Sequence, residues 1–213
     1  MTLKNIEINP VRDLSLNGVK NLTLVETILP RVENKVLILI RDFVLVLGFT
    51  VLTAISAKLK IEIGPVPITM QTLAVLLSGA LLGSKKGVAS QITYLLGGLA
   101  GIPWFSRGGG IQYLLSPTFG YIIGFVFASY LVGFLSERGL DKKIETSFLA
   151  MLAGNIVLYI PGLLWLVKFV GTSKILSIGF YPFLLGDLFK IILAGLFLPL
   201  GWQLIKRLYQ MKI

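Results

Sequence analysis

The sequence contains neither cysteine nor histidine. Without cysteine there is no disulfide, iron–sulfur cluster or thiolate metal site, and without histidine the commonest acid–base residue and the commonest metal ligand are missing. Charge is also scarce, since only 14% of the 213 residues are Asp, Glu, Lys or Arg, against about a quarter in soluble domains. We therefore expect no catalytic residues, no metal and no cofactor, and an intramembrane enzyme is disfavoured.

Long apolar runs take the place of charge, and 55% of the residues are hydrophobic. This pattern predicts an all-α membrane protein, a compact bundle of six transmembrane helices solvated by lipid. Three of the runs are shorter than the roughly 20 residues of a straight span, so a re-entrant pair is an alternative. The six runs cover residues 36–57, 68–82, 87–102, 120–135, 148–167 and 183–205.

Polar segments flank the predicted membrane domain, which covers residues 36–205. Residues 1–35 lack the apolar core of a signal peptide, so we expect a cytoplasmic leader. It is either disordered or forms a short surface helix over residues 19–29. Residues 206–213 form a short basic tail that is also expected in the cytoplasm.

The net charge of +10 is explained by membrane topology better than by nucleic-acid binding, because the basic residues flank apolar runs. With an inner N-terminus, fourteen of the 20 Lys and Arg residues fall in inner segments and five in outer loops. Because inner loops carry the excess of Lys and Arg, this count predicts a multi-pass protein of the cell membrane with both termini in the cytoplasm.

One charged pair, Asp187 and Lys190, lies inside the last apolar run. A spacing of three residues places both side chains on one helical face. A charge in hydrocarbon costs at least a few kcal/mol, so such residues face a cavity or each other. The pair is either an ion pair that neutralises itself or a recognition site, in which Lys190 keeps Asp187 ionised and Asp187 offers acceptor oxygens.

Two further segments carry polar or flexible residues. In the fifth run, Asn155 and Tyr159 share a helical face near Pro161, which should kink the helix, and they contact either a ligand or another helix. Between the third and fourth runs, three consecutive glycines between aromatic residues predict a Gly-rich outer lid loop, with an ordinary exposed turn as the alternative. No phosphate-binding loop of the G-x-x-x-x-G-K-[ST] type occurs, so the chain does not bind ATP in that way.

Several short motifs, taken in order along residues 43–205, resemble the BioY family. BioY proteins are the biotin-specific substrate-binding (S) components of energy-coupling-factor (ECF) transporters. The resemblance covers nearly the whole membrane part, and its specificity comes from the order of the motifs. They are Val66–Leu73, Leu82-Gly83-x-x-x-Gly87, Tyr94–Gly97, Gly101–Pro103, Pro117–Phe125 with its glycines, Gly154-Asn155 and Gly186-Asp187-x-x-Lys190.

The resemblance implies a high-affinity biotin-binding subunit that delivers biotin into the cytoplasm and is not itself an enzyme. It implies as partners a transmembrane coupling protein and cytoplasmic ATPase subunits. Thr53 and Ala57 occupy the positions of two family alanines that dock on the coupling protein. Ser116 replaces a usual glycine, and Arg107 sits where the family lid is often small. An S component for another small vitamin, a solitary biotin carrier and a structural membrane subunit remain alternatives, because fold does not fix ligand.

Biotin chemistry suggests roles for individual residues. Asp187 can accept a ureido N–H, and Lys190 can donate to the ureido carbonyl or neutralise a carboxylate. Aromatic residues can cover the apolar ring and tail, and amides can supply further hydrogen bonds. The other expected ligand contacts are Gln71, Trp104, Gln112, Tyr113, Tyr121, Asn155 and Tyr159, and the expected lid residues are Arg107, Gly108, Gly109 and Gly110.

Overall fold

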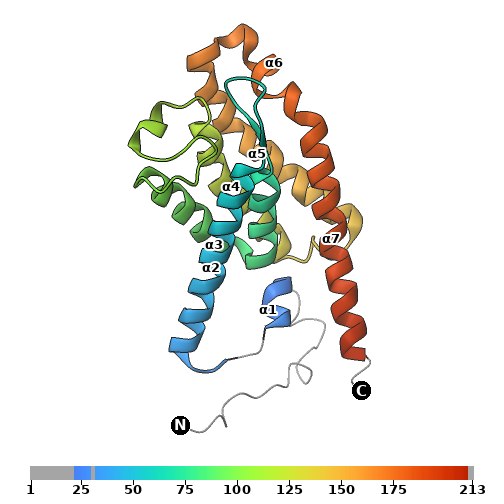
Figure 1. The fold of residues 1–213 in the computed structure, drawn as a ribbon. Helices are drawn as coiled ribbons and strands as arrows, with labels where there is room; N and C mark the ends of the chain where they lie inside the picture. Colours follow the sequence, from blue (N-terminus) through green and yellow to red (C-terminus); the bar gives the residue numbers. More distant parts are fainter. Residues whose placement is uncertain (1–21, 30–31, 211–213) are drawn as a thin grey trace.

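The computed structural model describes residues 22–29 and 32–210, which form a helical bundle (Figure 1). A short hairpin lies at the upper end in that view, and the first turn of α2 and the last turn of α7 lie at the lower end. The elements are α1 Leu24–Ile28, α2 Lys35–Lys58, β1 Lys60–Ile61, β2 Ile68–Thr69, α3 Gln71–Leu99, α4 Phe119–Ser136, α5 Ile144–Val170, α6 Ile175–Gly179 and α7 Leu184–Gln210, with 3-10 turns at Ile111–Leu115, Thr172–Lys174 and Tyr181–Phe183.

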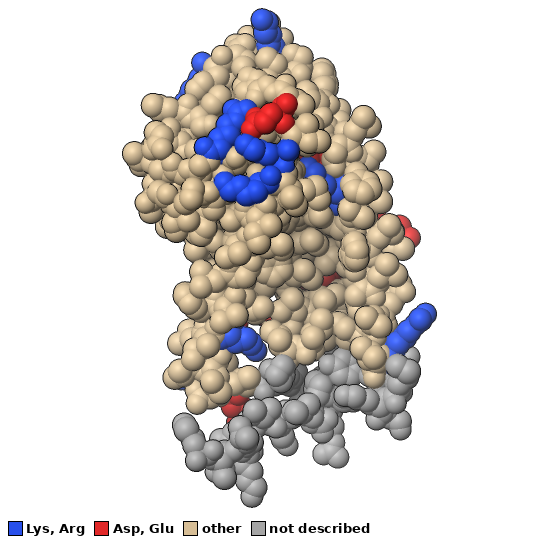
Figure 2. Space-filling view, viewed as in Figure 1, with Lys and Arg blue, Asp and Glu red and all other residues tan. Residues whose placement is uncertain are grey.

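Four described stretches are long and apolar enough to cross a membrane. They are Lys35–Lys58, Phe119–Ser136, Ile144–Val170 and Thr172–Leu208. Only 11% of the residues in the most apolar 18-residue stretch of α2 are buried, so most of its hydrophobic side chains face outward. Charged side chains on the face shown in Figure 2 gather toward the two ends, and the surface between them is mostly uncharged. An exposed apolar belt of this kind is stable in lipid and not in water.

The helix α3 is divided at Gly83, whose backbone is not helical (φ 83°, ψ 174°). This left-handed conformation suits glycine, and an added Cβ would lie 2.6 Å from a carboxylate oxygen of Glu137. Glu137 also accepts hydrogen bonds from the Ser84 backbone N–H (2.7 Å) and hydroxyl (2.9 Å), so it caps the second arm. The runs predicted at 68–82 and 87–102 therefore overlap the two arms of α3, residues 71–82 and 84–99, which Gly83 joins.

Glycines allow α3, α4 and α5 to pack backbone against backbone. A Cβ on Gly79 would lie 2.3 Å from the Ser129 carbonyl oxygen, and one on Gly124 would lie 2.4 Å from the Leu158 carbonyl oxygen. The Ser78 and Ser129 hydroxyls share a 3.0 Å hydrogen bond across the same α3–α4 contact. Such close approach through small residues is typical of membrane helix bundles.

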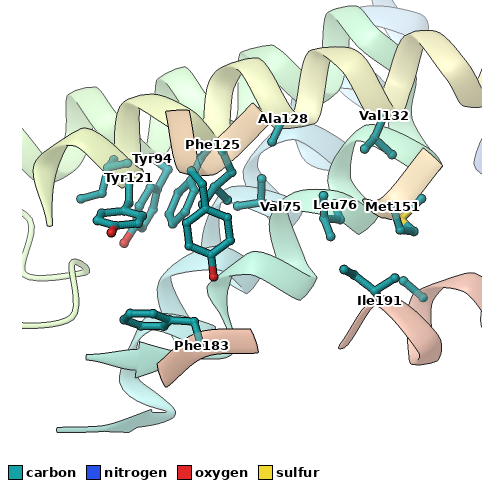
Figure 3. Close-up of a cluster of buried hydrophobic side chains, with 14 of the residues drawn as sticks. Val75, Leu76, Tyr94, Tyr121, Phe125, Ala128, Val132, Met151, Phe183 and Ile191 are labelled. Atoms are coloured by element: carbon teal, nitrogen blue, oxygen red, sulfur yellow. The ribbon is translucent and has the colours of Figure 1, made fainter. Parts of the chain in front are cut away.

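The buried core has an aromatic part and an aliphatic part (Figure 3). Tyr94, Tyr121, Phe125 and Phe183 gather at one end of the cluster, and smaller side chains fill the other. The smaller residues include Val75, Leu76, Ala128, Val132, Met151 and Ile191. Beside the aromatic end lies a group of buried polar side chains that includes the ion pair of Asp187 and Lys190.

The predicted docking residues Thr53 and Ala57 do not form an exposed surface in this conformation, and their docking role stays a prediction. Both residues are 0% exposed, because their face of α2 packs against α3. The Thr53 hydroxyl accepts a 3.4 Å hydrogen bond from the Gln91 side chain of α3. The opposite face of α2 carries the exposed residues, among them Leu52 and Ile55.

A short helix is present within the predicted leader. Thr23 and Glu26 form a reciprocal capping box at the start of α1. Leu24 is buried against Trp202 of α7, and Glu26 pairs with Lys86 of α3 at 2.8 Å. A helix is therefore present at Leu24–Ile28, inside the range 19–29 of the surface-helix alternative, and residues 1–21 and 30–31 of the leader lie outside the described part.

The connection between α4 and α5 carries a buried carboxylate, Asp141. Its Oδ2 accepts a 2.7 Å hydrogen bond from the Trp202 indole N–H. Burial raises the pKa of Asp141 from 3.8 to about 6, although the Trp202 bond and Lys142 oppose this shift. The folded state therefore holds a proton on Asp141 more tightly than the unfolded chain does.

Gly79→Ala should lower the free energy of unfolding by about 2 kcal/mol, because the new methyl group collides with the α4 backbone. The matched control is Gly48→Ala in α2, where a Cβ meets nothing within 4 Å. Thermal unfolding in detergent measures both variants, and equal unfolding temperatures would contradict the proposed close contact.

Asp141 should give stability a pH dependence that an amide lacks. Its stabilising contribution is present below about pH 4 and is lost as the pH rises to about 6, since the folded pKa is the higher one. Asp141→Asn should remove this loss, about 3 kcal/mol for a pKa shift of this size, while its side-chain oxygen still accepts from Trp202. Unfolding temperatures between pH 4 and pH 7 test this; parallel curves for the two proteins would rule it out.

Candidate functional site

A cavity of about 50 Å³ lies under the β1–β2 hairpin, where α3, α4, α5 and α7 meet. The hairpin segment and the loop before α4 form its roof, and four helices form its walls. The lining residues are Val66, Pro67 and Thr69 from the hairpin segment, Gln71 and Thr72 from α3, Ser106, Tyr113 and Thr118 from the loop before α4, Tyr121, Ile122 and Phe125 from α4, Leu158 and Tyr159 from α5, and Phe183, Asp187 and Lys190 from the last segment.

The Asp187 carboxylate is the polar centre of this cavity and is only 3% exposed. Its Oδ1 accepts hydrogen bonds from the Lys190 ammonium (3.0 Å) and the Thr72 hydroxyl (3.3 Å). Its Oδ2 accepts from the Asn155 side-chain amide (3.2 Å) and from the Tyr159 hydroxyl. Four donors from three helices therefore compensate the cost of burying one negative charge.

The Lys190 ammonium, 4% exposed, is equally well satisfied. Besides Asp187, it donates to the Thr72 hydroxyl (3.0 Å) and to the main-chain carbonyl of Thr69 (2.7 Å). These three acceptors use all three N–H donors of a lysine. Because Thr69 belongs to β2, Lys190 also fastens the hairpin to α7.

Asn155 contacts Asp187 but does not itself line the cavity. Its amide nitrogen donates to Asp187, while its Oδ1 is buried and has no hydrogen-bond partner among the described residues. Asn155 and Tyr159 lie on one face of α5, as their spacing predicts, and that face points to Asp187.

Aromatic side chains form the apolar wall. The Tyr121 hydroxyl donates to the Gly179 carbonyl (2.8 Å), which fixes the ring beside the cavity. Tyr159 packs edge-on against Tyr121 and Phe180, with ring centroids 6.1 Å and 5.0 Å away. A flat apolar ligand would meet ring faces and edges here.

The predicted ligand contacts fall into two groups. Six of them line the cavity: Gln71, Tyr113, Tyr121, Tyr159, Asp187 and Lys190. Asn155, Trp104 and Gln112 do not line it. The Trp104 indole donates to the Tyr94 carbonyl at 2.8 Å, and the exposed Gln112 amide donates to the Gly109 carbonyl at 2.7 Å, so both serve the loop itself.

Other lining residues were not among the predicted contacts. Thr72 occupies the first turn of α3, and its polar side chain at a helix start was a usable signal. Phe183 and Leu158 are apolar residues within apolar runs, so the sequence carries no signal that distinguishes them from other core residues.

Arg107 clasps the roof from outside. Its guanidinium donates to Glu62 (2.5 Å) and to the carbonyls of Pro65 (3.0 Å) and Gly64 (2.8 Å). The hydrogen bond from Arg107, with a second from Lys60, lowers the pKa of Glu62 to about 2. The clasp joins the loop before α4 to the hairpin loop, so the two parts of the roof are held together.

The glycines after Arg107 shape this loop. Gly108 and Gly110 both have positive φ angles (121° and 103°), which favour glycine. The Gly110 N–H donates to the Gly98 carbonyl of α3 at 2.7 Å, and a Cβ on Gly109 would lie 2.2 Å from the Ile102 carbonyl oxygen. The predicted Gly-rich segment is therefore packed tightly on the upper end of α3.

Comparisons with known proteins agree on one family. The model of the BioY family matches residues 26–207. The probable biotin transporter BioY of Pyrococcus horikoshii is 39% identical over 151 residues, covering 70% of this chain and 89% of that protein. The biotin transporter BioY of Thermotoga maritima is 38% identical over 151 residues, covering 70% and 88%.

A solved structure is also similar, the S-component for biotin from an ECF-type ABC transporter. It covers 80% of this chain and 92% of its own, with 27% identity and a TM-score of 0.65. Fold and sequence comparisons therefore point to the same group of proteins.

Lys190→Met should destabilise the protein by about 3–5 kcal/mol, because it leaves the buried Asp187 without its counter-ion. The double variant Asp187→Asn with Lys190→Met should recover much of this loss, since no unpaired charge remains. Thermal unfolding of the single and double variants in detergent measures the difference. A double variant less stable than the single one would contradict the charge-pair explanation.

Proposed function

The chain belongs to the BioY family, and on that premise we propose that it is the biotin-binding membrane subunit of an energy-coupling-factor transporter. It is a transport subunit and not an enzyme. The observation that carries the proposal is the buried Asp187–Lys190 pair (3.0 Å), which borders a largely apolar cavity under a two-part roof. Charges this costly in an apolar bundle are typical of a substrate site.

Biotin matches the lining of this cavity. Its ureido ring carries two N–H donors, which suit the Asp187 carboxylate, and its thioether ring and tail suit the aromatic and aliphatic wall of Tyr121, Phe125 and Phe183. Lys190 keeps Asp187 ionised and holds β2 in place. With its three donors already in use, Lys190 contributes mainly through Asp187 until the roof opens.

The two arms of α3 provide the missing spans of a six-helix bundle. In this proposal, α2, the two arms of α3, α4, α5 and α7 each cross the membrane, with the divided α3 supplying the two shortest crossings. The described ends of α2 and α7 lie at the same end of the molecule (Figure 1), which fits two cytoplasmic termini. The roof then faces outward and acts as the lid.

Transport follows from this arrangement in three steps. Biotin enters under the opened lid, and the Arg107–Glu62 clasp closes behind it. The loaded bundle then reorients in the membrane, driven by a transmembrane coupling protein and cytoplasmic ATPases. Biotin leaves inward when those partners cycle ATP.

Biotin binding in detergent and uptake by cells test the proposal together. We expect tight binding of biotin over other vitamins in a panel, and at least a hundred-fold loss of affinity in Asp187→Asn, which disrupts a charged hydrogen-bond network. Uptake of labelled biotin is measured with and without co-expressed coupling and ATPase subunits.

Each result has a distinct meaning. Uptake without the partners identifies a solitary carrier, and preferred binding of another vitamin identifies a different S component. Absence of both binding and uptake would overturn the proposed function.

A further inference from the structure

The acceptor capacity of Asp187 is already full in this structure. Its two oxygens accept from Lys190, Thr72, Asn155 and Tyr159, and a carboxylate offers about four lone-pair sites. A ligand N–H can therefore reach Asp187 only if one of the present donors leaves.

Three of the four donors are poorly placed to leave. Asn155 does not line the cavity, so a ligand entering there does not meet it. Lys190 would become a buried cation without its counter-ion. The Thr72 hydroxyl also accepts from Lys190 at 3.0 Å, so its removal disturbs the same pair.

Tyr159 is better placed to leave Asp187 than the other three donors. It lines the cavity, it is neutral, and its hydroxyl donates to Asp187 Oδ2 on the side away from Lys190. Its ring rests edge-on against Tyr121 and Phe180, and Phe180 lies in the connection between α6 and α7. A shift of this one ring would free an acceptor and enlarge the cavity at the same time.

We infer that the Tyr159 hydroxyl is a place-holder, a group that occupies Asp187 Oδ2 in the ligand-free protein and yields it to an N–H donor of the ligand. The inference rests on the proposed function, in which that donor is a ureido N–H. The Tyr159 hydroxyl also makes the site selective for ligands that carry an N–H donor, because an apolar ligand or one that only accepts hydrogen bonds cannot replace the Tyr159 donor. Leaving Asp187 one donor short inside the bundle would oppose the binding of such a ligand.

Tyr159→Phe tests the place-holder role because it removes one oxygen and keeps the packed ring. With no donor to displace, biotin should bind about ten-fold more tightly, the value of one hydrogen bond to a charged group. The ligand-free variant should unfold at a lower temperature than the wild type, and biotin should raise its unfolding temperature by more. Titration and thermal unfolding in detergent measure these changes.

Tyr121→Phe is the matched control. Tyr121 lines the same cavity, but its hydroxyl donates to the Gly179 carbonyl and not to Asp187. This variant should therefore not tighten biotin binding. In addition, a biotin analogue methylated at both ureido nitrogens should bind more weakly than biotin to both the wild type and Tyr159→Phe, because it has no N–H to place on Asp187.

Weaker or unchanged biotin binding in Tyr159→Phe would overturn the place-holder role, since weaker binding means that the hydroxyl donates to the ligand. Wild-type protein titrated alongside separates the two claims, because its failure to bind biotin would overturn the proposed function itself. A second readout requires no variant. Biotin added to the wild type should shift tyrosine ultraviolet absorption to shorter wavelength as a phenol leaves a carboxylate, and an unchanged spectrum would overturn the inference.

Discussion

The burial of one carboxylate, Asp187, in an otherwise apolar bundle is the constraint around which the upper half of the molecule is built. Its charge requires a buried ammonium, an amide and two hydroxyls, and these come from α3, α5 and α7. These three helices are thus fixed relative to each other by a polar network in addition to their apolar packing. The same network defines the cavity, because the donors that satisfy Asp187 are largely the residues that line it.

Two of the charged side chains that hold the roof, Lys190 and Arg107, differ in their surroundings. Lys190 reaches the hairpin from below and is buried, whereas the Arg107–Glu62 clasp lies on the surface. Salt screens the exposed pair strongly and the buried pair very little. The surface clasp is therefore the weaker fastener, and the buried one links the roof directly to the state of the binding site.

Much of this arrangement could be read from the sequence. The cost of charge in an apolar run identified Asp187 and Lys190, and the α5 spacing placed Asn155 and Tyr159 on the right face. Other features depend on packing that no local pattern reveals. Thr53 is buried because its face of α2 packs against α3, and the sequence does not show which face does so. Apolar lining residues such as Phe183 cannot be distinguished in the sequence from other core residues.

The hydrogen bond from Lys190 to β2 ends on a main-chain carbonyl, that of Thr69. Every amino acid supplies that acceptor, so the fastener tolerates replacement of the residue at position 69 as long as the strand keeps its path. At position 190 the chain has no such freedom, because the ammonium must serve three acceptors at once. This hydrogen bond therefore tolerates substitutions at position 69 of the hairpin but not at position 190 of α7.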